Sequence, residues 1–123
     1  MNRLLKKLSV AFVALFTILG LAACAPAQPI DMASVTAVID VRSASEFAAG
    51  HLQGAMNIDV ESAVFADEVS KLDKSGTYIV YCHSGRRAGV AKDTMASLGF
   101  TNVTNAGGYQ DASDATKLPL VTN

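Results

Sequence analysis

Residues 78–88 read Tyr-Ile-Val-Tyr-Cys-His-Ser-Gly-Arg-Arg-Ala, which is the most informative stretch of the chain. An apolar, β-prone run ends at Cys82, and a short loop with one glycine and two arginines leads into a helix-like segment. A strand, a tight loop and a helix in this order point several backbone N–H groups and the positive end of the helix dipole at one spot. The stretch therefore predicts an anion-binding loop in which Cys82 loses its proton more readily than a free thiol does.

The segments on either side alternate between strand and helix patterns. Continuous or β-branched apolar runs predict strands at 35–41, 54–58, 78–81 and 103–105. Helices are predicted at 43–50, where Ser43 and Glu46 can form a capping box, at 61–72 and at 87–98. This alternation predicts an α/β fold with a central, mostly parallel sheet of four to five strands and helices on both faces.

Two of these helices carry apolar residues at helical spacing, and those residues are predicted to face the core. They are Val64, Phe65, Val69 and Leu72 in the first helix, and Val90, Met95 and Leu98 in the second. The segment 111–123 is polar at first and is expected to pack as a short cap or to fray.

The first 23 residues have the order of a secretory signal peptide. Basic residues precede the apolar run 8–20, and Leu-Ala-Ala-Cys at 21–24 resembles a bacterial lipobox, in which the cysteine is lipidated. Cys24 would then anchor the chain to the membrane. Alternatively, the uncharged run 8–30 remains as a membrane span of the roughly 20 residues needed. Both interpretations place the rest of the chain outside the cytoplasmic membrane, facing the periplasm or the cell exterior.

The predicted organisation is a signal peptide at 1–23, a tether at 24–34, one domain at 35–115 and a C-terminal tail at 116–123. Cleavage would remove three of the ten basic residues and none of the eleven acidic ones, which leaves a net charge of −4. Because basic residues cluster only at Arg86 and Arg87 in the remainder, no nucleic-acid partner is expected. The domain is expected to be a monomer.

Cys82 is the only thiol left once Cys24 is assigned to the lipid. A lone thiol in an oxidising compartment is a liability, which favours a working nucleophile over a buried structural cysteine. The two histidines and one cysteine show no paired ligand spacing, so neither a metal nor another cofactor is expected.

Three motifs in order resemble the signatures of the rhodanese family of sulfurtransferases, in particular its small, exported, single-domain members. The first motif runs from Asp40-Val41-Arg42 through Glu46-Phe47 and Gly50-His51-Leu52 to Ile58, the second is Cys82–Arg87, and the third runs from Leu98-Gly99-Phe100 to Gly107-Gly108. The resemblance covers roughly 35–111 and implies a rhodanese-like fold. The aromatic residue usual beyond the double glycine is represented only by Tyr109, and the first edge strand is expected to be reduced to 30–32 or lost.

The resemblance implies a two-step sulfur transfer. The Cys82 thiolate takes the outer sulfur of an anionic donor such as thiosulfate, and a thiol or cyanide then takes that sulfur from the Cys82 persulfide. The loop would hold the anionic persulfide with its backbone N–H groups, and its residues are His83, Ser84, Gly85, Arg86 and Arg87. Arg86 and Arg87 would add positive charge for the donor.

The supporting residues have two interpretations each. Arg87 either binds substrate or pairs with a carboxylate such as Glu46 and braces the loop. Asp40 and Arg42 are expected to form structural hydrogen bonds, with substrate contact by Arg42 as the alternative. His51 is expected to be structural, and a general-base role for His83 is the less favoured interpretation.

Two other functions remain open at this stage. One is a phosphatase or arsenate reductase, but those enzymes place one more residue between cysteine and arginine, and their arginine would fall at Ala88. The other is a persulfide carrier or sensor lipoprotein without catalytic activity, which would use the same Cys82 loop.

Overall fold

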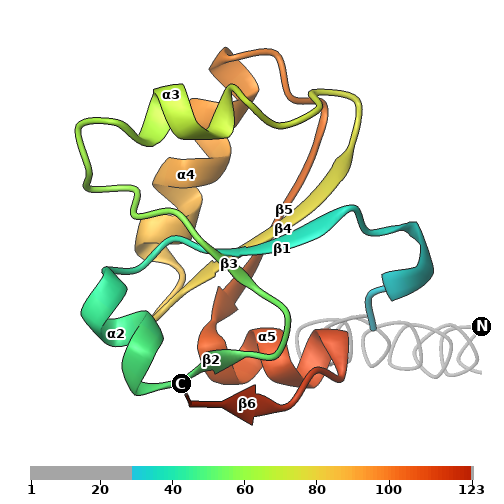
Figure 1. Ribbon diagram of the computed structural model, residues 1–123. Helices are drawn as coiled ribbons and strands as arrows, with labels where there is room; N and C mark the ends of the chain where they lie inside the picture. Colours follow the sequence, from blue (N-terminus) through green and yellow to red (C-terminus); the bar gives the residue numbers. More distant parts are fainter. Residues whose placement is uncertain (1–28, 123) are drawn as a thin grey trace, which may run out of the picture.

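The computed structural model describes residues 29–122 and builds them around a parallel four-stranded sheet (Figure 1). The strand order is β3 (Met56–Asn57), β1 (Ala37–Asp40), β4 (Thr77–Cys82) and β5 (Asn102–Gly108). Each of these strands lies inside or overlaps a segment predicted as a strand. The predicted α/β fold with a parallel central sheet is therefore confirmed.

The pairing of β4 with β5 is irregular at its carboxyl end. Residues 77–80 pair in sequence with residues 102–105, whereas Cys82 pairs with Gly108 after a register shift. From Val80 to Cys82 β4 advances two residues, while β5 advances three, from Asn105 to Gly108, so β5 holds one extra residue at this point. The double glycine at 107–108 is thereby placed directly beside the Cys82 loop.

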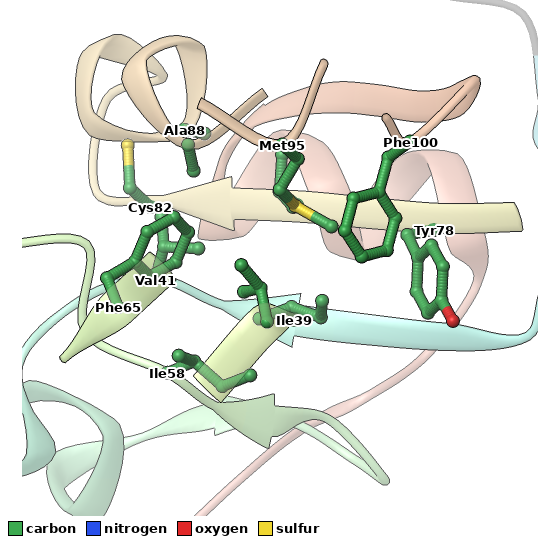
Figure 2. Close-up of a cluster of buried hydrophobic side chains, with 12 residues drawn as sticks. Ile39, Val41, Ile58, Phe65, Tyr78, Cys82, Ala88, Met95 and Phe100 are labelled. Carbon is green, nitrogen blue, oxygen red and sulfur yellow. The ribbon is translucent and has the colours of Figure 1, made fainter. Parts of the chain in front are cut away.

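Helices cover both faces of the sheet, as predicted. A core cluster that includes Ile39, Val80 and Met95 lies between the sheet and the helices α3 (Phe65–Val69) and α4 (Arg86–Ser97) (Figure 2). A second cluster that includes Val38 and Ile79 packs against α5 (Tyr109–Thr116). Neighbouring strand residues point to opposite faces, which explains why consecutive residues such as Val38-Ile39 and Ile79-Val80 are all apolar.

Helix α2 (Ala44–Ala49) follows β1 and begins at the predicted capping box. The Ser43 hydroxyl accepts a hydrogen bond from the Glu46 N–H (3.3 Å), and the Glu46 carboxylate accepts one from the Ser43 N–H (3.1 Å). Two orphan N–H groups are thus satisfied locally, so the start of this helix is encoded by residues three positions apart.

The helix predicted at 61–72 is shorter than expected, and two residues predicted to be inward are exposed. The turns before Phe65 compete with the helix, because Asp59 accepts from the Glu61 N–H (2.9 Å) and Ser62 from the Val64 N–H (3.3 Å). Val64 is 47% exposed, and Val90 on α4 is 51% exposed. The buried face of α4 consists instead of Ala88, Ala91 and Met95, whose small alanines let the helix lie close to the sheet.

The C-terminal tail is folded. After α5 the chain forms β6 (Leu120–Val121), which pairs antiparallel with a short strand that was not predicted, β2 (His51–Leu52). Helix α5 contains mostly poor helix formers, but its buried Ala112 belongs to the second cluster, and Tyr109 packs against that cluster. Long-range packing therefore decided a segment whose local signal is weak.

The folded region also extends before residue 35. Residues 32–34 form a 3₁₀ turn, η2 (Met32–Ser34), where the sequence left room for a reduced edge strand. The Ile30 N–H donates to the Ala115 carbonyl (3.0 Å), and Ile30 and Met32 pack against the second core cluster. Residues of the segment expected as a tether thus pack against the domain. The segment predicted as a signal peptide, Cys24 and the predicted tether as far as residue 28 lie outside the described residues. Within 29–122 no helix is long and apolar enough to span a bilayer.

Candidate active site

The Cys82 loop has the predicted strand, loop and helix geometry. Strand β4 ends at Cys82, three residues follow, and α4 begins at Arg86. The Cys82 side chain is fully buried, and its Sγ accepts a hydrogen bond from the Gly85 N–H (2.9 Å). Figure 2 shows this sulfur pointing toward the start of α4 beside Ala88. A negative charge on this sulfur would face both an N–H donor and the positive end of a twelve-residue helix.

Gly85 makes the turn into α4. Its φ of 98° lies in the left-handed region, which favours glycine. A Cβ added at Gly85 would also approach the Cα of Gly107 to 3.3 Å, so β5 passes close beneath the loop. A side chain at this position would disturb both the turn and the neighbouring strand.

The double glycine serves close packing. A Cβ at Gly108 would overlap the carbonyl oxygen of His83, although the backbone of Gly108 itself is extended and unstrained. Because Gly108 has no side chain, the backbone of the loop can pack against β5 beside Cys82.

Asn105 joins β5 to the loop and was not singled out from the sequence. Its Nδ2 donates to the Gly85 carbonyl (3.0 Å), and its Oδ1 accepts from the Gly107 N–H (2.8 Å). The available signal was an asparagine inside a strand, where this residue type is disfavoured, two positions before a double glycine.

Arg87 is committed to Glu46. Its two terminal nitrogens donate to the two carboxylate oxygens of Glu46, at 2.7 and 2.9 Å. These hydrogen bonds lower the pKa of Glu46 to about 2, and the same pairing raises the pKa of Arg87 further above its ordinary value. Of the two expected roles, the bracing role is the one the geometry displays, because both ends of the guanidinium fork are occupied.

Asp40 and Arg42 form a buried ion pair, in agreement with the expected structural role. The Arg42 Nη2 donates to Asp40 (2.6 Å) and to the Gly50 carbonyl (2.5 Å), while its Nε and its backbone N–H donate to the other carboxylate oxygen (both 2.9 Å). The hydrogen bond with Asp40 raises the pKa of Arg42 above its ordinary value. Asn57 donates to the carbonyls of both residues, which fixes the backbone between β1 and α2.

A pocket of about 380 Å³ opens beside the loop. The Arg42 guanidinium lies within it, 5.3 Å from the ring centroid of Tyr109, and the His83 ring lies 5.6 Å from the same ring. Strand β6 supplies a largely apolar wall, so the segment expected as a tail shapes the space beside His83. The lining residues are Arg42, Glu46, Ala49, Gly50, His83, Tyr109, Leu120, Val121 and Thr122.

The remaining predicted residues divide between surface and interior. His83, Ser84 and Arg86 are exposed, and Arg86 makes no ion pair with any residue in 29–122. His51 is buried, stacks on Phe47 at a centroid distance of 3.7 Å and places its Nδ1 2.8 Å from the Phe47 carbonyl, as a structural residue would. No group of three potential metal ligands is present in the described part of the chain.

The chain is similar to known proteins over this whole region. The family model described as a rhodanese-like domain matches residues 27–115. Thiosulfate sulfurtransferase PspE of Escherichia coli is 40% identical over 73 residues, which are 59% of this chain and 70% of that protein. The solved structure of a rhodanese with anions from E. coli superposes with a TM-score of 0.58 at 37% identity and covers 71% of this chain and 98% of the other. The human single-domain sulfurtransferase TSTD1 gives a TM-score of 0.55 at 29% identity, over 74% of this chain and 97% of the other.

Proposed function

The chain belongs to the rhodanese-like family and is a rhodanese-type sulfurtransferase, and we propose that it transfers a sulfane sulfur from thiosulfate or a similar anionic donor through a persulfide on Cys82. The observation that carries the proposal is the Gly85 N–H, 2.9 Å from Sγ at the N-terminus of α4. This arrangement stabilises a sulfur anion without any neighbouring base.

The first step forms one S–S bond and breaks another. The Cys82 thiolate attacks the outer sulfur of thiosulfate, and sulfite leaves with the electron pair of the broken S–S bond. Cys82 then carries a persulfide whose terminal sulfur is anionic. Arg86 is the arginine of the loop that is exposed and has no ion pair within 29–122, so it is placed to attract the donor.

The second step returns the enzyme to its starting state. A thiolate or cyanide attacks the outer sulfur of the persulfide, and the electron pair of the broken S–S bond stays on Cys82. The products are a new persulfide or thiocyanate. The pocket is lined by His83, the residue that follows Cys82, and offers the acceptor a space with apolar walls from β6 and one buried cation at Arg42.

The full-length chain in detergent tests this proposal. Thiosulfate alone should add the mass of one sulfur atom to the protein, and cyanide should then remove it as thiocyanate. Cys82→Ser should abolish both reactions, whereas Cys24→Ser, which changes the other cysteine, should leave them intact. Full thiocyanate production by the Cys82→Ser protein would overturn the mechanism.

Two other outcomes would indicate the alternative functions, a persulfide carrier or a phosphatase. A persulfide that forms on Cys82 but passes to no small thiol and not to cyanide would indicate a carrier. Robust hydrolysis of an aryl phosphate without reaction with thiosulfate would indicate a phosphatase. The latter is disfavoured because the position of a phosphatase's arginine is occupied by Ala88, and the preceding Arg87 is held by Glu46.

We also propose that the chain is exported and anchored to a membrane through a lipid on Cys24. The support is the order of basic, apolar and small residues at 1–24. Intact mass spectrometry of the membrane fraction should show a chain that begins at Cys24 and carries lipid, and Cys24→Ser should lose the lipid. An uncleaved chain of 123 residues would support the membrane-span alternative.

A further inference from the structure

We infer that Asn105 is a positioning residue for sulfur transfer, because its amide holds Gly85 in the conformation that aims the Gly85 N–H at Cys82. The inference rests on the proposed function of the Cys82 loop and extends it to a residue on β5. Asn105 touches neither the sulfur nor a substrate, so its effect passes through Gly85.

The contacts form a short chain. The Asn105 Nδ2 donates to the Gly85 carbonyl (3.0 Å), and the Gly85 N–H donates to Sγ of Cys82 (2.9 Å). The carbonyl and the N–H belong to successive peptide planes, which are joined through the two dihedral angles of Gly85, 98° and −17°. Fixing the carbonyl therefore restricts the direction of the N–H.

Gly85 needs such a restraint because glycine has the widest conformational freedom of any residue. Its carbonyl also accepts the first helical bond of α4, from the Gly89 N–H (3.0 Å). That bond holds the loop to its own helix, whereas Asn105 holds it to the sheet. The other end of the amide is fixed in turn, since its Oδ1 accepts from the Gly107 N–H (2.8 Å).

Packing alone does not account for Asn105. The residue is exposed on β5, belongs to neither core cluster, and is of a type disfavoured in strands. An amide has the donor and the acceptor that the carbonyl of Gly85 and the N–H of Gly107 require. A carboxylate could serve Gly107 but would repel both the Gly85 carbonyl and the sulfur anion.

The role matters most when the sulfur is charged. A thiolate or persulfide gains from a well-aimed N–H, and a neutral thiol gains little. Loss of one such restraint is expected to slow persulfide formation about three- to tenfold, the range of a typical net hydrogen bond. It should also shift the pH profile of Cys82 alkylation toward higher pH.

The experiment compares Asn105→Ala and Asn105→Asp with Asn102→Asp in the full-length chain in detergent. Asn102 lies at the other end of β5, paired with Thr77, so Asn102→Asp adds the same charge to the same strand far from the loop. Two quantities are measured, the rate of persulfide formation from thiosulfate and the midpoint of the pH profile for alkylation by iodoacetamide. A Cys24→Ser background leaves Cys82 as the only thiol.

Both Asn105 variants should lose rate and shift the alkylation midpoint upward, with unfolding midpoints close to the parent, while Asn102→Asp should match the parent. Unchanged midpoints and rates in both Asn105 variants, or an equal shift in Asn102→Asp, would overturn the inference. If the parent forms no persulfide, the proposed function fails, yet the alkylation profiles still test the positioning of Gly85. If Asn105→Ala does not fold, the near-isosteric Asn105→Asp variant tests the inference. It is then measured at high salt, which screens the added charge.

Discussion

Arg87 and Glu46 are joined by two parallel hydrogen bonds of 2.7 and 2.9 Å, which tie the first turn of α4 to the first turn of α2. The two helices follow different strands, so the pair holds the Cys82 loop against the end of β1. The positive charge of Arg87 is largely offset by Glu46, which leaves Arg86 as the exposed cation of the loop. The pair therefore shapes the loop more than it attracts the donor.

Glu46→Gln should flatten the dependence of stability on pH at low pH. The pKa of Glu46 is lowered from 4.5 to about 2 in the folded chain, chiefly by Arg87, so its contribution is present above about pH 4.5 and is lost as the pH falls toward 2. Because the Glu46 side chain is 36% exposed, the expected loss at neutral pH is less than about 1 kcal/mol. Urea unfolding at pH 7, 4 and 2.5 measures it. A variant with the same pH slope as the parent would argue against a stabilising pair.

Arg42→Met should destabilise the fold far more than the loss of Glu46. The change leaves the fully buried Asp40 carboxylate without its partner, which typically costs about 3–5 kcal/mol. The double variant Asp40→Asn, Arg42→Gln removes both charges together and should recover much of that loss. Free energies of unfolding for the single and double variants decide the matter, and equal losses in the two would show that the charge pair is not the cause.

Gly108→Ala should lower the rate of sulfur transfer, whereas Gly89→Ala should raise the stability of the fold. A Cβ at Gly108 would collide with the His83 carbonyl and displace the Cys82 loop, so sulfur transfer should fall at least tenfold. A Cβ at Gly89, inside α4, would meet only Asn105 at an ordinary 3.6 Å, and the helix should gain about 0.5–1 kcal/mol. Thermal unfolding and thiosulfate turnover of both proteins test the contrast. Full activity of Gly108→Ala would mean that the loop does not depend on this close packing.

Gly85→Ala and Gly54→Ala separate backbone strain from a local effect on the site. Both glycines have a positive φ, 98° and 82°, so each alanine should cost about 1–2 kcal/mol of stability. A Cβ at Gly85 would lie 3.3 Å from the Cα of Gly107, whereas a Cβ at Gly54 would meet nothing within 4 Å. Activity measured well below the unfolding temperature should be lost in Gly85→Ala and kept in Gly54→Ala. Equal activity in the two variants would show that the active site does not require a glycine at position 85.

The sequence predicted the parts of the site that depend on near neighbours. The capping box joins residues three positions apart, and the Cys82 loop is a strand end, a glycine turn and a helix start in one continuous stretch. The length of α3 was predicted less well, and so were the residues of α3 and α4 that face the core. Side-chain turns before Phe65 and the close approach of α4 through its alanines both override simple apolar spacing.

By itself, the sequence determined the parallel α/β sheet, the strand, loop and helix around Cys82, and the resemblance that led to the family. These follow from local chemistry, namely β-branched runs, caps and glycines. Only the tertiary structure decided that Arg87 pairs with Glu46 across 41 residues, that Asn105 holds Gly85 across 20, and that β6 lines the pocket. Such contacts join residues that lie far apart in the sequence, so their partners are set by how the sheet and helices pack.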